Sequence, residues 1–377
     1  MSRLALGASL LFLSGLACGD SAATGGSGGD VGNDGGGGST GSLVQTGGAG
    51  GEAGASGVGG SDGGGGGAGG ACDLLPSGAL TRSESNPMLL NGPEAYDFWK
   101  TGPRVVRKEG SSYRLWYEAV ADETYTTVGY ATSSDGIDWT KQGPVLAPSA
   151  SWEGNEVSPN SMLFEDGVYA LYYHAGGSDL VNRRVGRATS ADGLVWSKDG
   201  DPLLDLGPSG AFDDEQVAEP RVFHIGSEYR MYYTGRNEQT NETALGMATS
   251  ADGVSWTKYA GNPILSGAEW GNFWGGAFFF EAGRWHLWHG VTDGTSSSLH
   301  YASSADGVVW TAGPANPVLT QNPDPLAADN GLVGDSVSGY RDGDSYRIMY
   351  TGFNWELFGS EGRFEGICLA SVTDPCQ

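Results

Sequence analysis

The sequence ATSADGVSW at Ala248–Trp256 is repeated along the chain with small changes. Three further copies and a shortened fifth copy stand at residues 131–139, 188–196, 302–310 and 370–375. The aspartates of successive copies are 57, 60, 54 and 68 residues apart. Self-similarity at such a period is typical of proteins built from repeated structural units, so we take this repeat as the unit of the fold.

Each repeat contains three other segments in a fixed order. An apolar segment such as Pro220–Phe223 comes first, an aromatic segment such as Tyr229–Tyr233 follows it, and a segment such as Pro263–Leu265 comes after the Asp-Gly copy. Aromatic and β-branched runs separated by turn residues predict four short antiparallel strands per repeat, and the Asp-Gly pair predicts a hairpin. Four-stranded sheets repeated around an axis form a propeller. The sequence therefore predicts an all-β, five-bladed β-propeller of four-stranded antiparallel blades.

The start of this domain predicts how the ring closes. The chain has five copies of the first three strands but only four copies of the fourth strand downstream. The segment TRSESNPML at Thr81–Leu89 resembles TKYAGNPIL at Thr257–Leu265. We expect this N-terminal strand to complete the last blade, because a closed ring leaves no free sheet edge. The propeller domain is thus predicted to span residues 72–377.

The first 71 residues predict export and tethering. Residues 1–17 have one Arg, a short apolar run and then small residues, as a secretory signal peptide has. Cys18 in Gly-Leu-Ala-Cys resembles the lipidated cysteine of bacterial lipoproteins, and ordinary cleavage near Ala17 or Ala22 is the alternative. Residues 18–71 are rich in Gly and contain no aromatic residue, which predicts a disordered linker. We expect a lipoprotein of the cell envelope or surface, otherwise an extracellular protein, that contacts the membrane only through its lipid anchor.

Cysteine content and charge limit the partners of the domain. Export favours a disulfide, and Cys72–Cys376 would fasten the closing strand, with Cys368 as the rival partner. The formal net charge of −25 argues against nucleic acid as a partner, because phosphate binding needs a basic face. It favours a neutral or cationic ligand, or simply keeps the protein soluble. The spacing of the five His residues predicts no metal site, and we expect a monomer.

One face of the predicted propeller is the better candidate for function. The start of each innermost strand and the loop after each second strand share that face, and these loops differ between repeats while the Asp-Gly hairpins on the other face do not. Aligned across repeats, strand one begins with Gly102, Ser158, Glu219, Gly276 and Asp335, of which only Glu219 and Asp335 are acidic. Burial near the axis would raise the pKa of such a carboxyl and suit it to general-acid catalysis. A structural salt bridge with Arg104 or Arg221 is the alternative.

The repeat pattern, with its Y-x-x-W-Y, A-T-S-x-D-G-x-x-W and P-V-L segments, resembles the five-bladed propeller glycoside hydrolases of families 32, 43, 62, 68 and 130 over residues 72–377. The resemblance implies action on furanosides, xylosides, fructans or mannosides, with one acid at the start of strand one in each of the first three blades. Glu219 in Ala-Glu-Pro matches the general acid of the third blade, whereas the first two blades have Gly102 and Ser158 instead of acids. The resemblance also implies a Ca²⁺ ion in the axial channel, and no other cofactor is expected.

Hydrolysis of a glycosidic bond needs a second carboxylate, so other residues near this face are candidates. Acids that recur shortly before strand one are Asp97, Glu153 and Asp213, with Asp214, Glu156 and Glu215 beside them. Recurrence is also what a structural loop acid would show. Loops after strand two supply candidate sugar contacts at Glu118, His174, Arg236 and Asn237. Aromatic faces stack on sugar rings, and Trp274 and Trp99 are the candidates for that contact.

The function that these features favour is that of a surface-tethered glycosidase with Glu219 as its general acid and an oligo- or polysaccharide as its partner. The missing strand-one acids favour a non-catalytic carbohydrate-binding propeller instead. A protein-interaction scaffold of the cell envelope is a third hypothesis, and it would present a large apolar patch where an enzyme presents an acid-lined pocket.

Overall fold

The computed structural model confirms the prediction of an all-β domain. It describes residues 76, 78–122, 124–177, 181–292, 296–331, 333–354 and 365–375. The described helical segments are single turns, namely η1 (Ala95–Asp97), η2 (Ser151–Glu153) and α1 (Gly267–Trp270). No helix among the described residues is long and apolar enough to cross a membrane. The predicted signal peptide, the glycine-rich segment, Cys18, Cys72 and Cys376 lie outside the described residues.

The strands form groups within which every pairing is antiparallel. Group 1 contains β3 (Lys100–Glu109), β4 (Ser112–Asp122), β5 (Tyr125–Ser133) and β6 (Thr140–Leu146). Group 2 contains β7 (Glu156–Glu165), β8 (Val168–Gly176), β9 (Arg184–Ser190) and β10 (Ser197–Lys198). Group 3 contains β11 (Gln216–Ile225), β12 (Glu228–Arg236), β13 (Thr243–Ser250) and β14 (Thr257–Lys258). Group 4 contains β15 (Trp274–Glu281), β16 (Arg284–Thr292), β17 (Ser297–Ser304), β18 (Thr311–Ala312) and β19 (Leu319–Thr320). Group 5 contains β20 (Val333–Asp342), β21 (Ser345–Phe353), β22 (Glu365–Thr373), β1 (Thr81–Arg82) and β2 (Leu89–Leu90).

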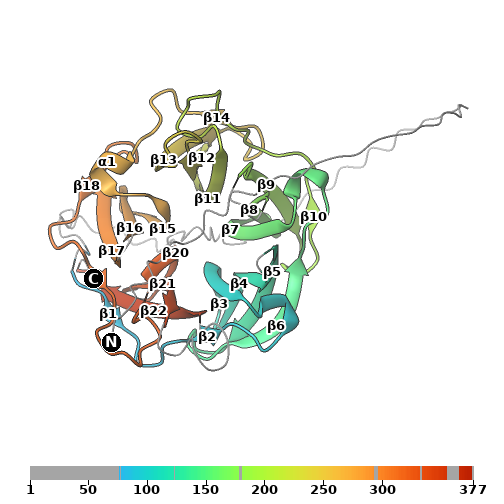
Figure 1. Cartoon of the computed structure of the whole chain (residues 1–377). Helices are drawn as coiled ribbons and strands as arrows, with labels where there is room; N and C mark the ends of the chain where they lie inside the picture. The colour runs from blue at the N-terminus through green and yellow to red at the C-terminus, as the bar shows by residue number, and fades with distance from the viewer. Residues whose placement is uncertain are drawn as a thin grey trace, which may run out of the picture. The chain divides into compact units, whose positions relative to one another are not determined.

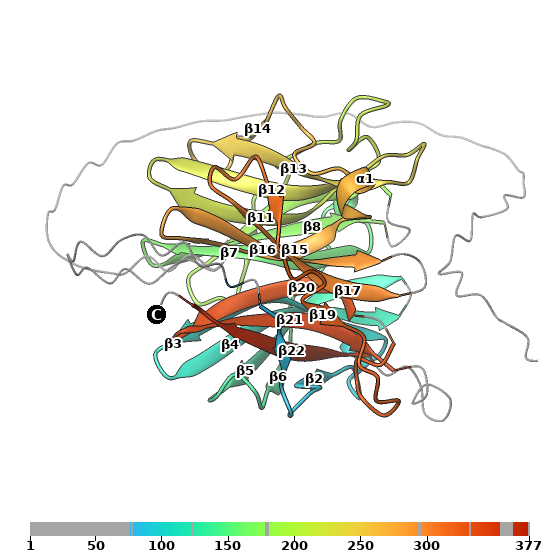
Figure 2. The ribbon, with the colours of Figure 1, turned by 90° about the vertical axis from the view of Figure 1, so that its left-hand side faces the viewer.

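The groups are arranged around a common centre, with the first strand of each long hairpin innermost (Figure 1). Each of these inner strands, β3, β7, β11, β15 and β20, contacts the next, and β20 contacts β3. Seen from the side, the long strands of the groups lie along broadly the same line, with neighbouring strands antiparallel (Figure 2). The strand ends therefore lie on two opposite faces. A short parallel bridge between Thr126 and Glu156 joins groups 1 and 2 into one eight-stranded sheet.

The repeated Ser-x-Asp-Gly sequence forms the same turn in four groups. In group 3, Asp252 Oδ1 accepts the backbone N–H groups of Val254 at 2.8 Å and Ser255 at 2.7 Å, and Gly253 adopts a φ of 70°. Asp135, Asp192 and Asp306 make the same contacts. Side chains of the preceding group then donate to the Gly carbonyl oxygens, as Tyr232 does to Gly307 at 3.0 Å. The repeat is therefore conserved within the chain because it forms the turn and also fastens neighbouring groups.

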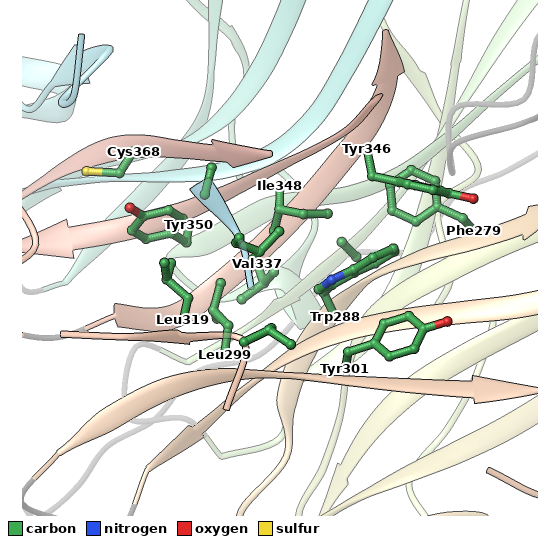
Figure 3. Close-up of a cluster of buried hydrophobic side chains, with 14 of the residues drawn as sticks. Phe279, Trp288, Leu299, Tyr301, Leu319, Val337, Tyr346, Ile348, Tyr350 and Cys368 are labelled. Carbon is green, nitrogen blue, oxygen red and sulfur yellow. The ribbon is translucent and has the colours of Figure 1, made fainter. Parts of the chain in front are cut away.

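The hydrophobic core consists of clusters that lie between neighbouring groups. In the cluster of Figure 3, Phe279 and Trp288 of group 4 face Val337 and Ile348 of group 5. Aromatic rings dominate these contacts; for example, the Phe279 and Tyr346 rings meet edge to face with centroids 4.9 Å apart. Such packing places every inner strand at a defined distance from its neighbours, which is what positions side chains at the centre.

The N-terminal segment pairs with the last group. Thr81 and Arg82 pair with Ser371 and Ala370 of β22, at the register that Thr257–Lys258 has with β13 in group 3.

Cys368, which the sequence left open as a disulfide partner, is a free thiol buried in the cluster between groups 4 and 5. Burial raises the pKa of this thiol, with a further contribution from the Asp329 charge. Cys368 is therefore a core residue, and the alternative of a disulfide through it is not supported.

Candidate active site

The strand ladders confirm which segments share a face. Gly102 pairs with Glu118, Ser158 with His174, and Ala218 with Thr234, so the starts of β3, β7 and β11 lie beside the ends of β4, β8 and β12. The residues that follow the aromatic segments on β4, β8 and β12 therefore lie next to the residues that begin the inner strands, as expected for antiparallel hairpins.

Glu219 lies in a β-bulge with an unusual backbone conformation. Ala218 pairs with Thr234 and Arg221 with Tyr232, so Glu219 and Pro220 together oppose Tyr233. The φ of Glu219 is 54°, in the left-handed region that non-glycine residues rarely adopt. Such backbone strain persists only where the surroundings enforce it, and it is common at functional sites.

The bulge also corrects the alignment of strand one. In β15 the corresponding left-handed residue is Gly275, with a φ of 58°, rather than Gly276. The ladders likewise place Gly102 and Ser158 level with Ala218, one residue before Glu219. The bulge itself recurs in all three strands. The alignment was wrong by one position because it followed the prolines, and Pro103 and Pro159 are level with Glu219, one residue before the level of Pro220.

The Glu219 carboxylate is buried and contacts the side chains of Thr234 and Arg104. Thr234 Oγ1 donates a hydrogen bond to Oε2 at 3.0 Å, and Arg104 Nη1 lies 3.3 Å from Oε1. Gly275 leaves the necessary space, since a Cβ there would lie 2.7 Å from Oε2. The backbone N–H of Glu219 donates to His174 Nδ1 at 3.3 Å. The ion pair with Arg104 is the contact that the structural alternative expected.

A second carboxylate, Glu118, shares the same guanidinium. Arg104 Nε donates to Glu118 Oε2 at 2.9 Å, its Nη2 contacts the same oxygen, and Ser158 Oγ donates to it at 2.8 Å. Burial opposes ionisation of Glu118, but the charges of Arg104 and Lys100 outweigh this and hold its pKa well below the ordinary range. The sequence placed Glu118 on this face as a sugar contact. A signal for a larger role was present, because Glu118 is the only acid at the position that His174 and Thr234 occupy in the next two repeats.

His174 belongs to an adjoining polar network. Its backbone N–H donates to Asn160 Oδ1 at 3.0 Å, and its Nε2 lies 3.4 Å from Glu156 Oε1. Arg183 holds Glu156 through two hydrogen bonds of 2.6 Å. Burial opposes ionisation of Glu156, yet Arg183 and His174 lower its pKa. This network lies directly behind the Glu219 backbone and fixes it.

The other predicted sugar contacts differ in their burial and in their hydrogen-bond partners. Arg236 is buried and pairs with Glu215 at 3.1 Å and with Asn241 at 2.7 Å. Asn237 caps its own loop by accepting the backbone N–H of Thr240. Trp99 and Trp274 are partly exposed beside the starts of β3 and β15. The side chain of Asp335 lies outside the described residues.

The recurring loop acids Asp97, Glu153 and Asp213 make the same contacts in three groups. Each accepts a hydrogen bond from the last tyrosine of the aromatic segment at 2.8–2.9 Å and pairs with a lysine at 2.6 Å. In group 5, Asp329 repeats the motif with Tyr350 and Arg82. We define these contacts as the acid–tyrosine–cation triads. Repetition at equivalent places outside the Glu219 centre is what structural side chains show, so we interpret these three acids as scaffold.

We expect Asp213→Asn to lower the free energy of unfolding by about 1–3 kcal/mol, because it removes the charged partner of Lys258 and weakens the acceptor for Tyr233. Its kcat should change little, since neither partner contacts Glu219. Urea unfolding and steady-state kinetics on the same preparation test this. A loss of kcat by about 10²-fold or more at unchanged stability would return Asp213 to the catalytic candidates.

The axial residues do not suit the Ca²⁺ ion that the family resemblance implies. Arg221 is buried at the axis and donates to the carbonyl oxygens of Gly276 and Val337, at 2.8 Å each, and of Asn160. Burial and the nearby Arg104 lower the pKa of Arg221 to about 10. The carbonyl oxygens that could bind a cation thus already hold a guanidinium, and no group of three His, Cys, Asp or Glu among the described residues could hold a metal ion.

Cavities alone do not mark this site. A cavity of about 340 Å³ lies at the closing segment of group 5, lined by residues such as Arg82, Asn86 and Leu326. A second cavity, of about 20 Å³, lies beside Arg104 and Arg221. We place the candidate site at Glu118 and Glu219 because converging carboxylates, and not volume, are what sugar chemistry requires.

Comparison with known proteins gives one family match and several relatives. The model of the beta-1,4-mannooligosaccharide phosphorylase family matches residues 156–330. An uncharacterised protein of Mycobacterium tuberculosis is 29% identical over 150 residues, covering 38% of this chain and 48% of the relative. Raffinose invertase of Escherichia coli is 27% identical over 167 residues, covering 42% of this chain and 33% of the relative. The chain thus spans half or less of the length of these relatives.

Solved structures with a similar fold include glycoside hydrolases. A structure described as a glycoside hydrolase has a TM-score of 0.63 at 17% identity, covering 77% of this chain and 92% of the other. A second, from the family of mannoside phosphorylases that contains glycoside hydrolases acting on beta-1,2 mannosidic linkages, has a TM-score of 0.60 at 17% identity, covering 81% and 96%. The chain therefore has the fold of the propeller-type glycoside hydrolases, and its middle part matches the mannooligosaccharide phosphorylase family.

Proposed function

We propose that this protein is a carbohydrate-acting enzyme that cleaves glycosidic bonds, with Glu219 as general acid and Glu118 as the second carboxylate. The observation that carries the proposal is that both carboxylates are buried and contact the single guanidinium of Arg104. A shared guanidinium brings two carboxyl groups close together, and glycosidases use an acid together with a base or nucleophile roughly 5–10 Å away.

The contacts of the two carboxylates support different roles. Arg104 contacts Glu118 through two nitrogens and Glu219 through one. With its lowered pKa, Glu118 stays ionised at neutral pH and is suited to activate or replace the attacking group. Glu219 then donates a proton to the departing sugar oxygen. The strained backbone of Glu219, fixed by His174 and Thr234, keeps its carboxyl directed at one place.

Neighbouring side chains support a sugar as the substrate. Trp99 and Trp274 are partly exposed at the starts of two inner strands and supply apolar faces for sugar rings. The matched family is described by its action on mannooligosaccharides, and one relative by its action on raffinose. We propose an oligosaccharide of this kind as substrate, with His174, Arg236 and Asn237 as polar contacts.

A screen of the full chain against mannosides, fructans, arabinan and xylan tests the proposal, with released sugars measured alongside binding. We expect cleavage of at least one of these substrates. Binding without cleavage of any of them would favour the second candidate, a non-catalytic carbohydrate-binding propeller, for which the resting ion pair between Glu219 and Arg104 is the supporting observation. Neither binding nor cleavage would favour a protein-interaction scaffold.

We also propose that the five strand groups are the blades of a five-bladed propeller closed by the N-terminal strand. The support is that each inner strand contacts the next, that the last inner strand, β20, contacts the first, β3, and that β1 and β2 pair with β22.

From the sequence we further propose an exported, monomeric lipoprotein anchored at Cys18 with a glycine-rich tether, in which Cys72 and Cys376 form a disulfide.

A further inference from the structure

Arg221 is a buried cation at the axis that forms no ion pair with a carboxylate in the part of the chain that the structure describes. Its Nε donates to the carbonyl oxygen of Gly276 and its Nη2 to that of Val337, at 2.8 Å each, and its Nη1 donates to that of Asn160. A guanidinium has five N–H groups. One hydrogen on each Nη therefore has no acceptor among the described residues.

The two carboxylates of the candidate site contact a different guanidinium. Glu118 and Glu219 both pair with Arg104. Burial and the positive charge of Arg104 lower the pKa of Arg221 to about 10, and the negative charge of Glu219 offsets this only in part. Because a buried charge is costly unless a charged partner compensates it, Arg221 has reason to bind an anion.

A small cavity beside Arg221 is lined by further hydrogen-bond donors. The cavity has a volume of about 20 Å³, and its lining includes Asn160 and Ser338, which are 2% and 4% exposed. Asn160 Nδ2 and Ser338 Oγ are buried and have no hydrogen-bond partner within the described structure. An amide nitrogen only donates, and a hydroxyl group can donate. The unpartnered groups of this cavity can therefore all point hydrogens at one bound atom.

We infer that one monatomic anion, chloride or bromide, binds at the axis between Arg221, Asn160 and Ser338. The volume holds about one particle of the size of water, which excludes phosphate and carboxylate ligands. A metal cation would face donors. A water molecule could not balance the charge of Arg221, and its own two hydrogens would need acceptors, whereas a halide accepts from every donor.

The net charge of the chain does not prevent this binding. The formal charge of −25 repels anions at long range, but salt screens exposed charges over about 10 Å at 0.1 M ionic strength. The local guanidinium and the donors around the cavity therefore determine the affinity. The anion would hold together residues of groups 2, 3 and 5, so its binding should stabilise the fold. This role is independent of the proposed function.

The first test compares the Tm of the full chain in sodium chloride and in sodium acetate, titrated at matched concentrations up to about 0.1 M. Acetate is too large for the cavity and serves as the control anion. We expect the Tm to rise with chloride relative to acetate, by about 5 °C at a concentration of roughly 100 times Kd. The same Tm in both salts at every concentration would overturn the inference.

A variant tests whether the anion binds at these residues. Ser338→Ala removes one donor and should raise the Kd for chloride about tenfold, as expected for one hydrogen bond to a charged group. Ser161→Ala is the matched control. Ser161 faces the fourth residue of its aromatic segment, as Ser338 does, but its hydroxyl group already bonds with Val222. This control should keep the Kd of the wild type. An unchanged Kd in Ser338→Ala would contradict the assignment.

A direct observation does not depend on any variant. Crystals of the full chain soaked in sodium bromide should show an anomalous difference peak between Arg221 and Ser338, because bromine scatters anomalously and water does not. A map without a peak at the axis would show that the cavity holds water only and would overturn the inference.

Discussion

Glu219→Gln is expected to lower kcat by about 10²–10⁴-fold, the range that a positioned general acid contributes. The substitution keeps the volume of the side chain and its contact with Thr234, but an amide cannot donate a proton to the departing sugar oxygen. It also removes one anionic partner of Arg104, which remains paired with Glu118. The fold should therefore persist while the chemical step slows.

Steady-state kinetics on the best substrate, with the free energy of unfolding measured for the same preparation, test this expectation. Glu228→Gln is the control, since it removes a surface carboxylate whose ion pair in the described structure is with Arg230. A companion variant, Glu118→Gln, should also lose kcat, because the second carboxylate would be absent. If Glu219→Gln retains kcat within a small factor while remaining folded, Glu219 serves only as the partner of Arg104.

Arg221→Met is expected to give the largest loss of stability, about 3–5 kcal/mol in the free energy of unfolding. Arg221 is 4% exposed, and its guanidinium donates to carbonyl oxygens in groups 2, 4 and 5. Methionine fills a similar space but leaves these buried acceptors without donors. Removing a buried charge recovers part of that cost, which is why the expected loss is smaller than three hydrogen bonds to a cation would give.

Denaturant unfolding followed by tryptophan fluorescence measures this loss. Arg184→Met is the control, because Arg184 lies 3.6 Å from a largely exposed Asp205, and such surface pairs contribute at most about 1 kcal/mol. A loss as small as that of the control would show that Arg221 does not hold the groups together at the axis.

Much of the fold could be predicted from the sequence because the relevant interactions are local. Asp252 forms its turn with backbone groups two and three residues away, and Gly253 provides the left-handed conformation that the turn needs. Alternation between aromatic segments and such turns specifies antiparallel hairpins, and the hairpin connectivity decides which strand ends share a face. Glu219 was chosen as a catalytic candidate for the same reason, since it stands near the start of an inner strand.

The site itself could be predicted only in part. Glu118 was assigned to the correct face, but its pairing with Glu219 through Arg104 joins groups 1 and 3 across the centre, and no spacing along the chain encodes that contact. Conversely, Asp97, Glu153 and Asp213 were catalytic candidates on sequence grounds, and the structure shows each of them in an acid–tyrosine–cation triad.

The sequence by itself determined the all-β class, the repeated hairpins and the face on which side chains vary, because these depend on contacts between residues close in the chain. Only the tertiary structure decided the position of the bulge at Glu219, the sharing of Arg104 and the use of Arg221 at the axis. Those features depend on how separate sheets pack around one centre, where distances between side chains are set by the core and not by their separation in sequence.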